Sequence, residues 1–217
     1  MVEDKLPLIL KPSTAELDQR SLEIEWRDQA QRFIQLGFHN ELGLSEAEYL
    51  DSLPKFEPQP EEYRGRFDVY LLVETRIPWE RQAELAGIVV SEYLRSRIKE
   101  IREWEGNNSK TPNVPYTGWF NNWGQRFASQ IRPFDARDQL AQDECGGGLF
   151  EGVAQQVHHP KVTLSGKYFD LIGYSVESDD VPALHRWHGR PEFLARWGDL
   201  AYPHFRPLVR GSKVVTR

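Results

Sequence analysis

Apolar residues near the start of the chain recur every three or four positions. The stripe ends at Gly37, and glycine is a residue type that commonly terminates helices. Its members are Leu22, Trp26, Ala30, Phe33 and Ile34. This spacing places the apolar side chains on one face of a helix, so the pattern predicts a helix that ends near Gly37.

Two Ser-x-x-Glu sequences mark helix starts. Ser13 is followed by Glu16, and Ser45 is followed by Glu48. Each pair fits a capping box, in which the two side chains satisfy free amide groups of the first turn. The first box predicts where the first helix begins, after an extended arm. The second predicts a shorter helix that stops before Pro54.

The middle of the chain begins with a strand pattern and then turns helical. Residues 67–74 (FDVYLLVE) are rich in Val, Leu and Tyr, which predicts a buried strand. From Pro78 onward the apolar spacing changes to three and four. We expect two helices here, over 79–86 and 89–105, with a bend at Gly87.

An aromatic group follows. Its members are Tyr116, Trp119, Phe120, Trp123 and Phe127. Their spacing favours a short helix that gathers the rings on one face. The plain interpretation is an aromatic core, and the alternative is a ligand-stacking platform with Trp119 and Trp123 as ligand-binding candidates.

Two more helices are expected around a run of three glycines. Asp135 is a candidate cap for a helix over 136–144, which the glycines at 146–148 would end. Residues 149–157 (LFEGVAQQV) predict another helix.

The last quarter carries strand patterns. Segments 162–164, 168–176 and 181–187 read as strands, and 193–197 reads as a strand or one helical turn. From Tyr202 onward Pro and Gly residues predict an irregular end.

Asp170 falls inside one of these strand patterns. Because successive side chains of a strand point to opposite faces, we expect Asp170 to face outward while Phe169 and Leu171 face inward. An inward Asp170 would instead be a candidate for acid–base chemistry.

These elements predict an α+β fold, in which a helical N-terminal part packs on a small, mostly antiparallel sheet built from 67–74, 162–176 and 181–187. The length of 217 residues suits a single domain over 1–217. Its expected parts are an arm (1–12), a helical segment (13–53), a central segment (66–176) and a β-rich or irregular C-terminal segment (177–217).

Composition changes this picture little. Hydrophobic residues make up 39% of the chain, enough for a core, and no apolar run approaches the length of a membrane span. The single cysteine excludes an internal disulfide. The first residues carry acids ahead of the apolar stretch, unlike a secretory signal, so we expect a cytoplasmic protein without a membrane partner.

The net charge of −6 is unevenly distributed. Residues 1–62 hold 14 acidic and 6 basic residues, a net of −8, whereas 186–217 hold 7 basic and 2 acidic residues, a net of +5. Either the two ends attract each other on one surface, or the basic end meets an anionic partner.

Cys145 precedes the glycine run and is a candidate nucleophile. Glycine amide groups can hold an oxyanion, and Glu144, His158 or His159 would supply catalytic partners. The glycines 146–148 are also ligand-binding candidates. The alternative is a structural turn, because free cysteines are usually buried and the run lacks the lysine and hydroxyl residue of a phosphate-binding loop.

The histidines offer a metal site. His158 or His159 together with His185 or His188 would supply imidazole ligands. The alternative is that all four cap loops or lie at the surface, because no acidic ligand cluster accompanies them.

The C-terminal block mixes arginines with aromatic rings. Arg190, a further ligand-binding candidate, is followed by Arg196, Arg206 and Arg210 among Trp and Tyr residues. Such mixing binds single-stranded nucleic acid or covers a protein surface with stacked arginines. The acidic pI of about 5.6 argues against a dedicated nucleic-acid binder.

Three motifs carry a resemblance to a known family. The sequences DECGGGLFEGVA at 143–154, HHP at 158–160 and GRPEFLARW at 189–197 resemble, in this order, a small bacterial family defined only as a domain of unknown function. The resemblance covers about residues 45–211. It implies that 143–160 and 189–197 pack together and that 88–110 is an addition, and it brings no activity, cofactor or catalytic residue.

Three functions remain open at this point. The leading one is a binding or interaction protein without catalysis, which uses the aromatic and glycine-rich region and has a protein as its candidate partner. The second is a hydrolase-like enzyme that uses Cys145 or a histidine-bound metal. The third is a nucleic-acid-associated protein. No cofactor is indicated.

Overall fold

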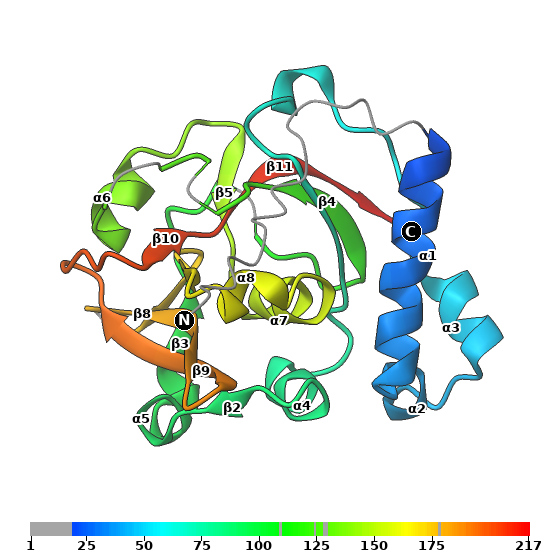
Figure 1. Cartoon of the computed structure of the whole chain (residues 1–217), viewed down its shortest axis with the longest axis horizontal. Coiled ribbons are helices and arrows are strands. Elements are labelled where there is room, and N and C mark those ends of the chain that lie inside the picture. The colour runs from blue at the N-terminus through cyan, green and yellow to red at the C-terminus, as the bar shows by residue number, and fades with distance from the viewer. Residues whose placement is uncertain (1–18, 109, 124, 128–129, 178) are drawn as a thin grey trace, which may run out of the picture.

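A computed structural model describes residues 19–108, 110–123, 125–127, 130–177 and 179–217. Helices gather in the N-terminal part and strands dominate the remainder, so the predicted α+β class is confirmed (Figure 1). The N-terminal arm and the Ser13–Glu16 capping box lie outside the described residues. None of the helices in the described ranges is both long and apolar enough to cross a membrane.

The helices of the described ranges are short apart from the first. They are α1 (Gln19–Gln35), α2 (Phe38–Glu41), α3 (Glu46–Ser52), α4 (Trp79–Leu85), α5 (Glu92–Ser96), α6 (Pro133–Asp138), α7 (Leu149–His158) and α8 (Lys161–Leu164), with the 3-10 helices η1 (Glu61–Tyr63) and η2 (Ile98–Glu100).

The strands form two sheets instead of the single expected one. The first sheet is antiparallel, and its order is β1 (Val69–Val73), β4 (Tyr116–Phe120), β11 (Val209–Thr216), β5 (Glu144–Gly146). The predicted strand 67–74 therefore belongs to a different sheet from 168–176 and 181–187. Long-range pairing of this kind leaves no mark in a local sequence pattern.

The second sheet is centred on β8 (Asp180–Trp187), which pairs antiparallel with β6 (Tyr168–Asp170), β7 (Tyr174–Val176) and β9 (Arg190–Trp197). Three further strands pair with these neighbours. They are β2 (Val89–Val90) beside β9, β3 (Ile101–Glu103) beside β7 and β10 (Phe205–Pro207) beside β6.

Helix α7 lies at the centre of the molecule (Figure 1). It contacts β1 of the first sheet, β8 of the second sheet, and the helices α1 and α4. Its apolar side chains join a core cluster with Leu71 and Tyr116 of the first sheet and Leu184 and Phe193 of the second. This helix therefore couples the two sheets through one hydrophobic core.

Several local predictions are confirmed. The helices predicted from strongly periodic segments are present as α1, α4 and α7, and the predicted strands are present as β1, β8 and β9. At Ser45 the capping box is present, since the serine side chain accepts from the Glu48 amide and the Glu48 carboxylate accepts from the Ser45 amide.

The prediction of one helix over 89–105 is wrong. Gly87 has a φ of +65° and ends α4, after which Val89 and Val90 pair with β9. A separate helix, α5, starts where the Ser91 side chain accepts a hydrogen bond from the Leu94 amide, and β3 follows η2. Short apolar runs fit both helix and strand, and the pairing strand lies about a hundred residues away.

The prediction of a helix through the aromatic residues of 116–127 is also wrong. Tyr116 to Phe120 form β4, which lies between β1 and β11 and is buried at every position. A strand buried on both faces shows no alternation of apolar and polar residues. Its aromatic residues are well suited to such a strand.

Three further boundaries differ from the prediction. The helix expected over 136–144 ends at Asp138, because Glu144 to Gly146 pair with β11. Residues 162–164 belong to helix α8. The irregular end expected from Tyr202 contains β10 and β11, and the register of β11 shifts between Arg210 and Val214, which hides its strand period.

Asp170 does not face outward. It is fully buried on β6 and forms an ion pair with Arg196 of β9. Phe169 and Leu171 are buried as well, so both faces of this strand lie inside the protein. Burial raises the pKa of Asp170 to about 6, although Arg196 partly offsets that effect.

Candidate functional site

Cys145 and Glu144 lie on β5, inside the protein. Cys145 is fully buried, and its backbone pairs with that of Arg210. Both carboxylate oxygens of Glu144 accept from Nε of Arg126, at 2.8 and 3.0 Å, and one also accepts from the Ala141 amide. These contacts hold the end of β5 in place and leave neither residue facing a cavity described below.

The three glycines use their amide groups within the protein. Gly146 donates to Oδ1 of Asn107 at 2.9 Å, and Gly147 donates to the carbonyl of Leu208 at 2.8 Å. Gly148 donates to the Glu151 carboxylate at 3.0 Å. A Cβ on Gly148 would lie 2.2 Å from the Tyr174 ring. The glycine run therefore packs closely against neighbouring segments where it leads into α7, and none of its three amides is directed at an oxyanion.

The two candidate tryptophans pack into the structure. Trp119 on β4 is nearly buried and its ring lies 5.4 Å from that of Tyr70. Trp123 donates from Nε1 to the carbonyl of Tyr168 at 2.9 Å, and the guanidinium of Arg206 lies 4.8 Å from its ring. Both are explained as packing residues, and neither lines the cavities described below.

The structure separates the histidines into two places. His158 ends α7, where its Nε2 lies 3.0 Å from the carbonyl oxygen of Leu72, and His159 follows it. His185 on β8 contacts Oε2 of Glu192 at 2.9 Å, and His188 lies in the turn after β8. Within the described ranges, no group of three His, Cys, Asp or Glu side chains is placed to hold a metal ion.

The arginines of the C-terminal block are mostly internal. Arg196, Arg206 and Arg210 are buried, whereas Arg190 is exposed at the start of β9. The block therefore presents little of its positive charge to solvent. Lys213 of β11 pairs with Glu62, which joins the basic C-terminal segment to the acidic N-terminal one at this point.

A buried polar network that the sequence did not reveal connects β4, α7 and β11. The hydroxyl of Tyr116 donates to Oε1 of Glu151 at 2.5 Å, and Nε of Arg210 lies 3.5 Å from the same oxygen. All three side chains are fully buried. Burial, followed by the neighbouring Glu151 charge, raises the pKa of Tyr116 well above its usual value. With no access to solvent, the network serves the fold.

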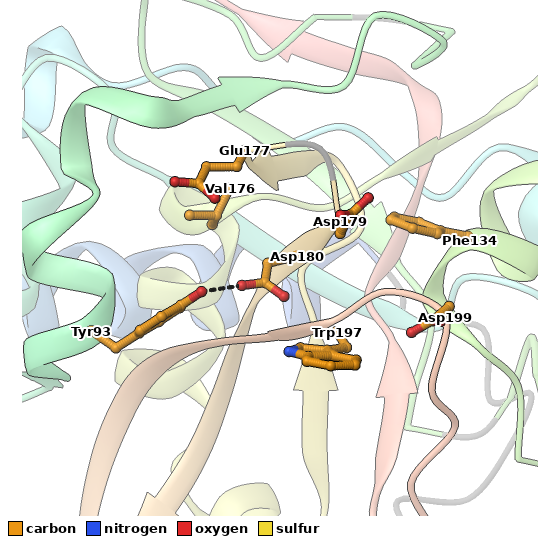
Figure 2. A pocket seen from close by; sticks show the side chains of 8 residues that line it. All are labelled: Tyr93, Phe134, Val176, Glu177, Asp179, Asp180, Trp197 and Asp199. Atoms are coloured by element: carbon orange, nitrogen blue, oxygen red, sulfur yellow. Dashed lines mark hydrogen bonds between the residues drawn. The ribbon is translucent and has the colours of Figure 1, made fainter.

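One cavity does combine charge with accessible aromatic surface. It has a volume of about 310 Å³ and lies where the open end of the β8–β9 hairpin meets α5, α6 and the end of β7 (Figure 2). Four acidic residues and three aromatic rings line it. The lining residues are Tyr93, Phe134, Val176, Glu177, Asp179, Asp180, Trp197 and Asp199.

Asp180 forms the buried side of this cavity, and the exposed Tyr93 is hydrogen-bonded to it. Asp180 is only 7% exposed, and its Oδ2 accepts a hydrogen bond of 2.6 Å from the Tyr93 hydroxyl (Figure 2). This bond is the main reason that the pKa of Tyr93 is raised, so the hydroxyl stays a donor. The other oxygen of Asp180 has no hydrogen-bond partner among the described residues.

Trp197 and Phe134 supply the aromatic walls. Trp197 pairs with Asp180 across the β8–β9 ladder, so both side chains emerge on the same face of the hairpin. The indole is 64% exposed. Phe134 lies against Gly198, whose Cβ would come within 2.3 Å of that ring. Glycine at this position therefore allows Phe134 to reach the cavity wall.

An arginine lies at the rim of the cavity. The guanidinium of Arg97 stacks 4.0 Å from the centroid of the Tyr93 ring, and its Nε lies 3.2 Å from Oε1 of Glu177. Glu177 has a φ of +55°, an unusual conformation for a residue with a side chain. The pKa of Glu100 is raised chiefly because its carboxyl shares a hydrogen bond with Glu177.

A second cavity, of about 450 Å³, has a different character. The end of α3, the loop after it and the last residues of the chain line it. Its charged groups, Asp51, Lys55 and Arg217, are of both signs, and none of its lining residues is aromatic. The side chains that line it therefore do not favour one type of ligand.

Comparisons with known proteins returned no matching family, no matching curated protein and no matching solved structure. The site must therefore be interpreted from its own geometry. Its acidic residues Glu177, Asp179 and Asp180 come 17 to 20 residues before Trp197 in the chain, and Asp199 follows it by two. No local sequence pattern places Asp180 opposite Trp197, because the pairing of β8 with β9 brings them together.

Proposed function

We propose that this protein is a binding protein without catalysis, and that the cavity at the open end of the β8–β9 hairpin recognises a positively charged group. The binding class is the one expected from the sequence. The proposed place differs, because the aromatic and glycine-rich region around Trp119 and Gly146–Gly148 is packed inside the protein.

A single observation carries the proposal. Asp180 is a nearly buried carboxylate with one oxygen fixed by Tyr93 and the other without a described partner, beside the exposed ring of Trp197. A carboxylate in such a place gains from a charge-assisted hydrogen bond. The face of an indole attracts the same cation. The two effects therefore favour one kind of ligand.

The surrounding charges act in the same direction. Asp179, Asp199 and Glu177 line the same cavity, whereas none of its lining residues is basic. Arg97 at the rim is already paired with Glu177 and stacked on Tyr93. The field inside the cavity therefore attracts cations and repels anions, as low-dielectric walls focus charge of one sign.

Calorimetric titration with short capped peptides tests this function. Gly-Arg-Gly and Gly-Lys-Gly carry the cation, and Gly-citrulline-Gly has nearly the shape of the arginine peptide without its charge. We expect binding of at least one cationic peptide and none of the citrulline peptide. Binding should weaken as salt increases.

Matched variants locate the binding to this cavity. Asp180→Asn should weaken it at least tenfold, whereas Glu105→Gln, which neutralises an exposed acid outside the cavity, should leave it unchanged. Equal binding of the citrulline peptide, or no effect of Asp180→Asn on binding, would overturn the proposal. Circular dichroism of each variant confirms that it is folded.

A further inference from the structure

We infer that the cation taken by this cavity is a guanidinium, presented as an arginine side chain by a peptide or protein partner. The inference rests on the proposed function, since it names the ligand of the same cavity. It starts from the way this protein already holds one of its own arginines at the cavity rim.

Arg97 shows how the rim accommodates a guanidinium. The group lies over the Tyr93 ring at 4.0 Å while its Nε faces the Glu177 carboxylate at 3.2 Å. Stacking on an aromatic ring together with lateral hydrogen bonds to a carboxylate is the arrangement that a planar guanidinium favours. An ammonium group has no flat face to stack.

The interior of the cavity repeats the same two elements without an occupant from the described chain. Trp197 provides an exposed ring, and Asp180 provides a carboxylate oxygen without a described partner. Asp199 is a second carboxylate among the lining residues (Figure 2). A guanidinium has five N–H donors and can contact two carboxylates while it stacks, which an ammonium group cannot do.

Hydration favours the same choice. The cavity opens to solvent at Trp197, so it cannot surround a small cation completely. A lysine ammonium is strongly hydrated and would lose much of that hydration for few new contacts, whereas a guanidinium is weakly hydrated. The volume of about 310 Å³ also exceeds what a guanidinium needs, which leaves room for the arginine stem.

The partner is inferred to be a peptide or protein because of what surrounds the cavity. Trp197 is 64% exposed and Leu200, just beyond the lining residue Asp199, is 43% exposed. Exposed tryptophan beside a pocket that accepts arginine is the composition of an interface hot spot. A free amino acid would leave this apolar rim uncovered.

The test compares arginine with lysine in the same peptide. We expect Gly-Arg-Gly to bind at least ten times more tightly than Gly-Lys-Gly, and free arginine to bind more weakly than the peptide. Trp197→Leu should reduce the arginine-to-lysine ratio toward one. The matched control Trp187→Leu removes the other exposed tryptophan of the hairpin, which does not line the cavity, and should keep the ratio.

The outcomes separate this inference from the proposed function. Equal binding of the two peptides, or tighter binding of the lysine peptide, overturns the guanidinium assignment and leaves a cation-binding protein. Equal binding of free arginine and the arginine peptide overturns the peptide or protein partner. Absence of binding to both peptides overturns the inference and the proposed function together. A Trp197→Leu variant that keeps the wild-type ratio overturns the stacking role.

Discussion

The hydroxyl of Tyr93 on α5 donates a hydrogen bond of 2.6 Å to Oδ2 of Asp180, the first residue of β8. This bond ties a short helix to the central strand of the second sheet. It also fixes which oxygen of Asp180 remains for a ligand. The same ring supports Arg97, so Tyr93 links the rim of the cavity to its interior.

Tyr93→Phe removes this hydrogen bond and keeps the ring. We expect a loss of about 0.5–1 kcal/mol in the free energy of unfolding, because the ring is partly exposed and water replaces the hydroxyl in part. Urea denaturation measures the change. Tyr202→Phe is the control, since that hydroxyl has no described hydrogen bond, and a loss no larger than in the control would contradict the structural role of the bond.

Glu151→Gln tests the buried network of β4, α7 and β11. The substitution leaves the fully buried Arg210 without its compensating charge, and removing one partner of a buried ion pair costs about 3–5 kcal/mol. We expect a loss of this size in urea or thermal denaturation. Glu23→Gln removes an acid whose partner Arg27 is exposed, and it should cost less than about 0.5 kcal/mol. Similar losses in both variants would contradict the role of the network.

Local sequence patterns were sufficient where an element is stabilised by its own neighbours. The Ser45 capping box and the apolar stripe before Gly37 gave the correct helices, because capping and amphipathic spacing act within a few residues. The α7 pattern succeeded as well, although the helix is buried on nearly all sides and carries the buried acid Glu151.

Patterns failed where distant strands determine the structure. Tyr116 to Phe120 form a strand only because β1 and β11 flank them, and Ile101 to Glu103 pair with β7 more than seventy residues later. The cavity depends on the same effect. Asp180 and Trp197 are opposite each other through strand pairing, and α5 supplies Tyr93 from a third part of the chain. No spacing rule within one segment could assemble these residues.

Cys145 gives a direct test of burial in the first sheet. The side chain is fully buried on β5, so a thiol reagent such as Ellman's should not react with the native protein on the timescale of minutes. Full reaction should follow unfolding in guanidinium chloride. The chain has one cysteine, so the signal belongs to this residue alone. Native reaction as fast as that of the unfolded chain would contradict the burial.

Asp170 should make the stability depend on pH in the acidic range. Its pKa is raised by burial to about 6 in the folded protein, compared with about 3.9 in an unfolded chain. The folded state therefore binds the proton more tightly, and the contribution of Asp170 to stability falls as pH rises from about 4 to about 6.

Comparison with Asp170→Asn isolates the contribution of Asp170 to the pH dependence of stability. Between pH 4 and 6 the wild type should lose up to about 3 kcal/mol relative to the variant, as measured by urea denaturation at each pH. Asp51→Asn, at an exposed position, is the control and should follow the wild-type profile. A constant difference between wild type and Asp170→Asn across this range would contradict the raised pKa.

His158 should act in the opposite direction. Burial lowers its pKa well below the usual value of about 6.5, and its ring packs edge-on against Phe33 while Nε2 faces the Leu72 carbonyl. In the unfolded chain this histidine becomes protonated as pH falls below about 6.5, whereas in the folded protein it stays neutral to a lower pH. Its contribution to stability is therefore present above that pH and is lost as pH falls toward the lowered pKa, at most about 1.4 kcal/mol per pH unit. His158→Asn should lose this acid-dependent part while His188→Asn, at an exposed turn, keeps it. Parallel pH profiles for wild type and His158→Asn would show that His158 titrates alike in the folded and unfolded states.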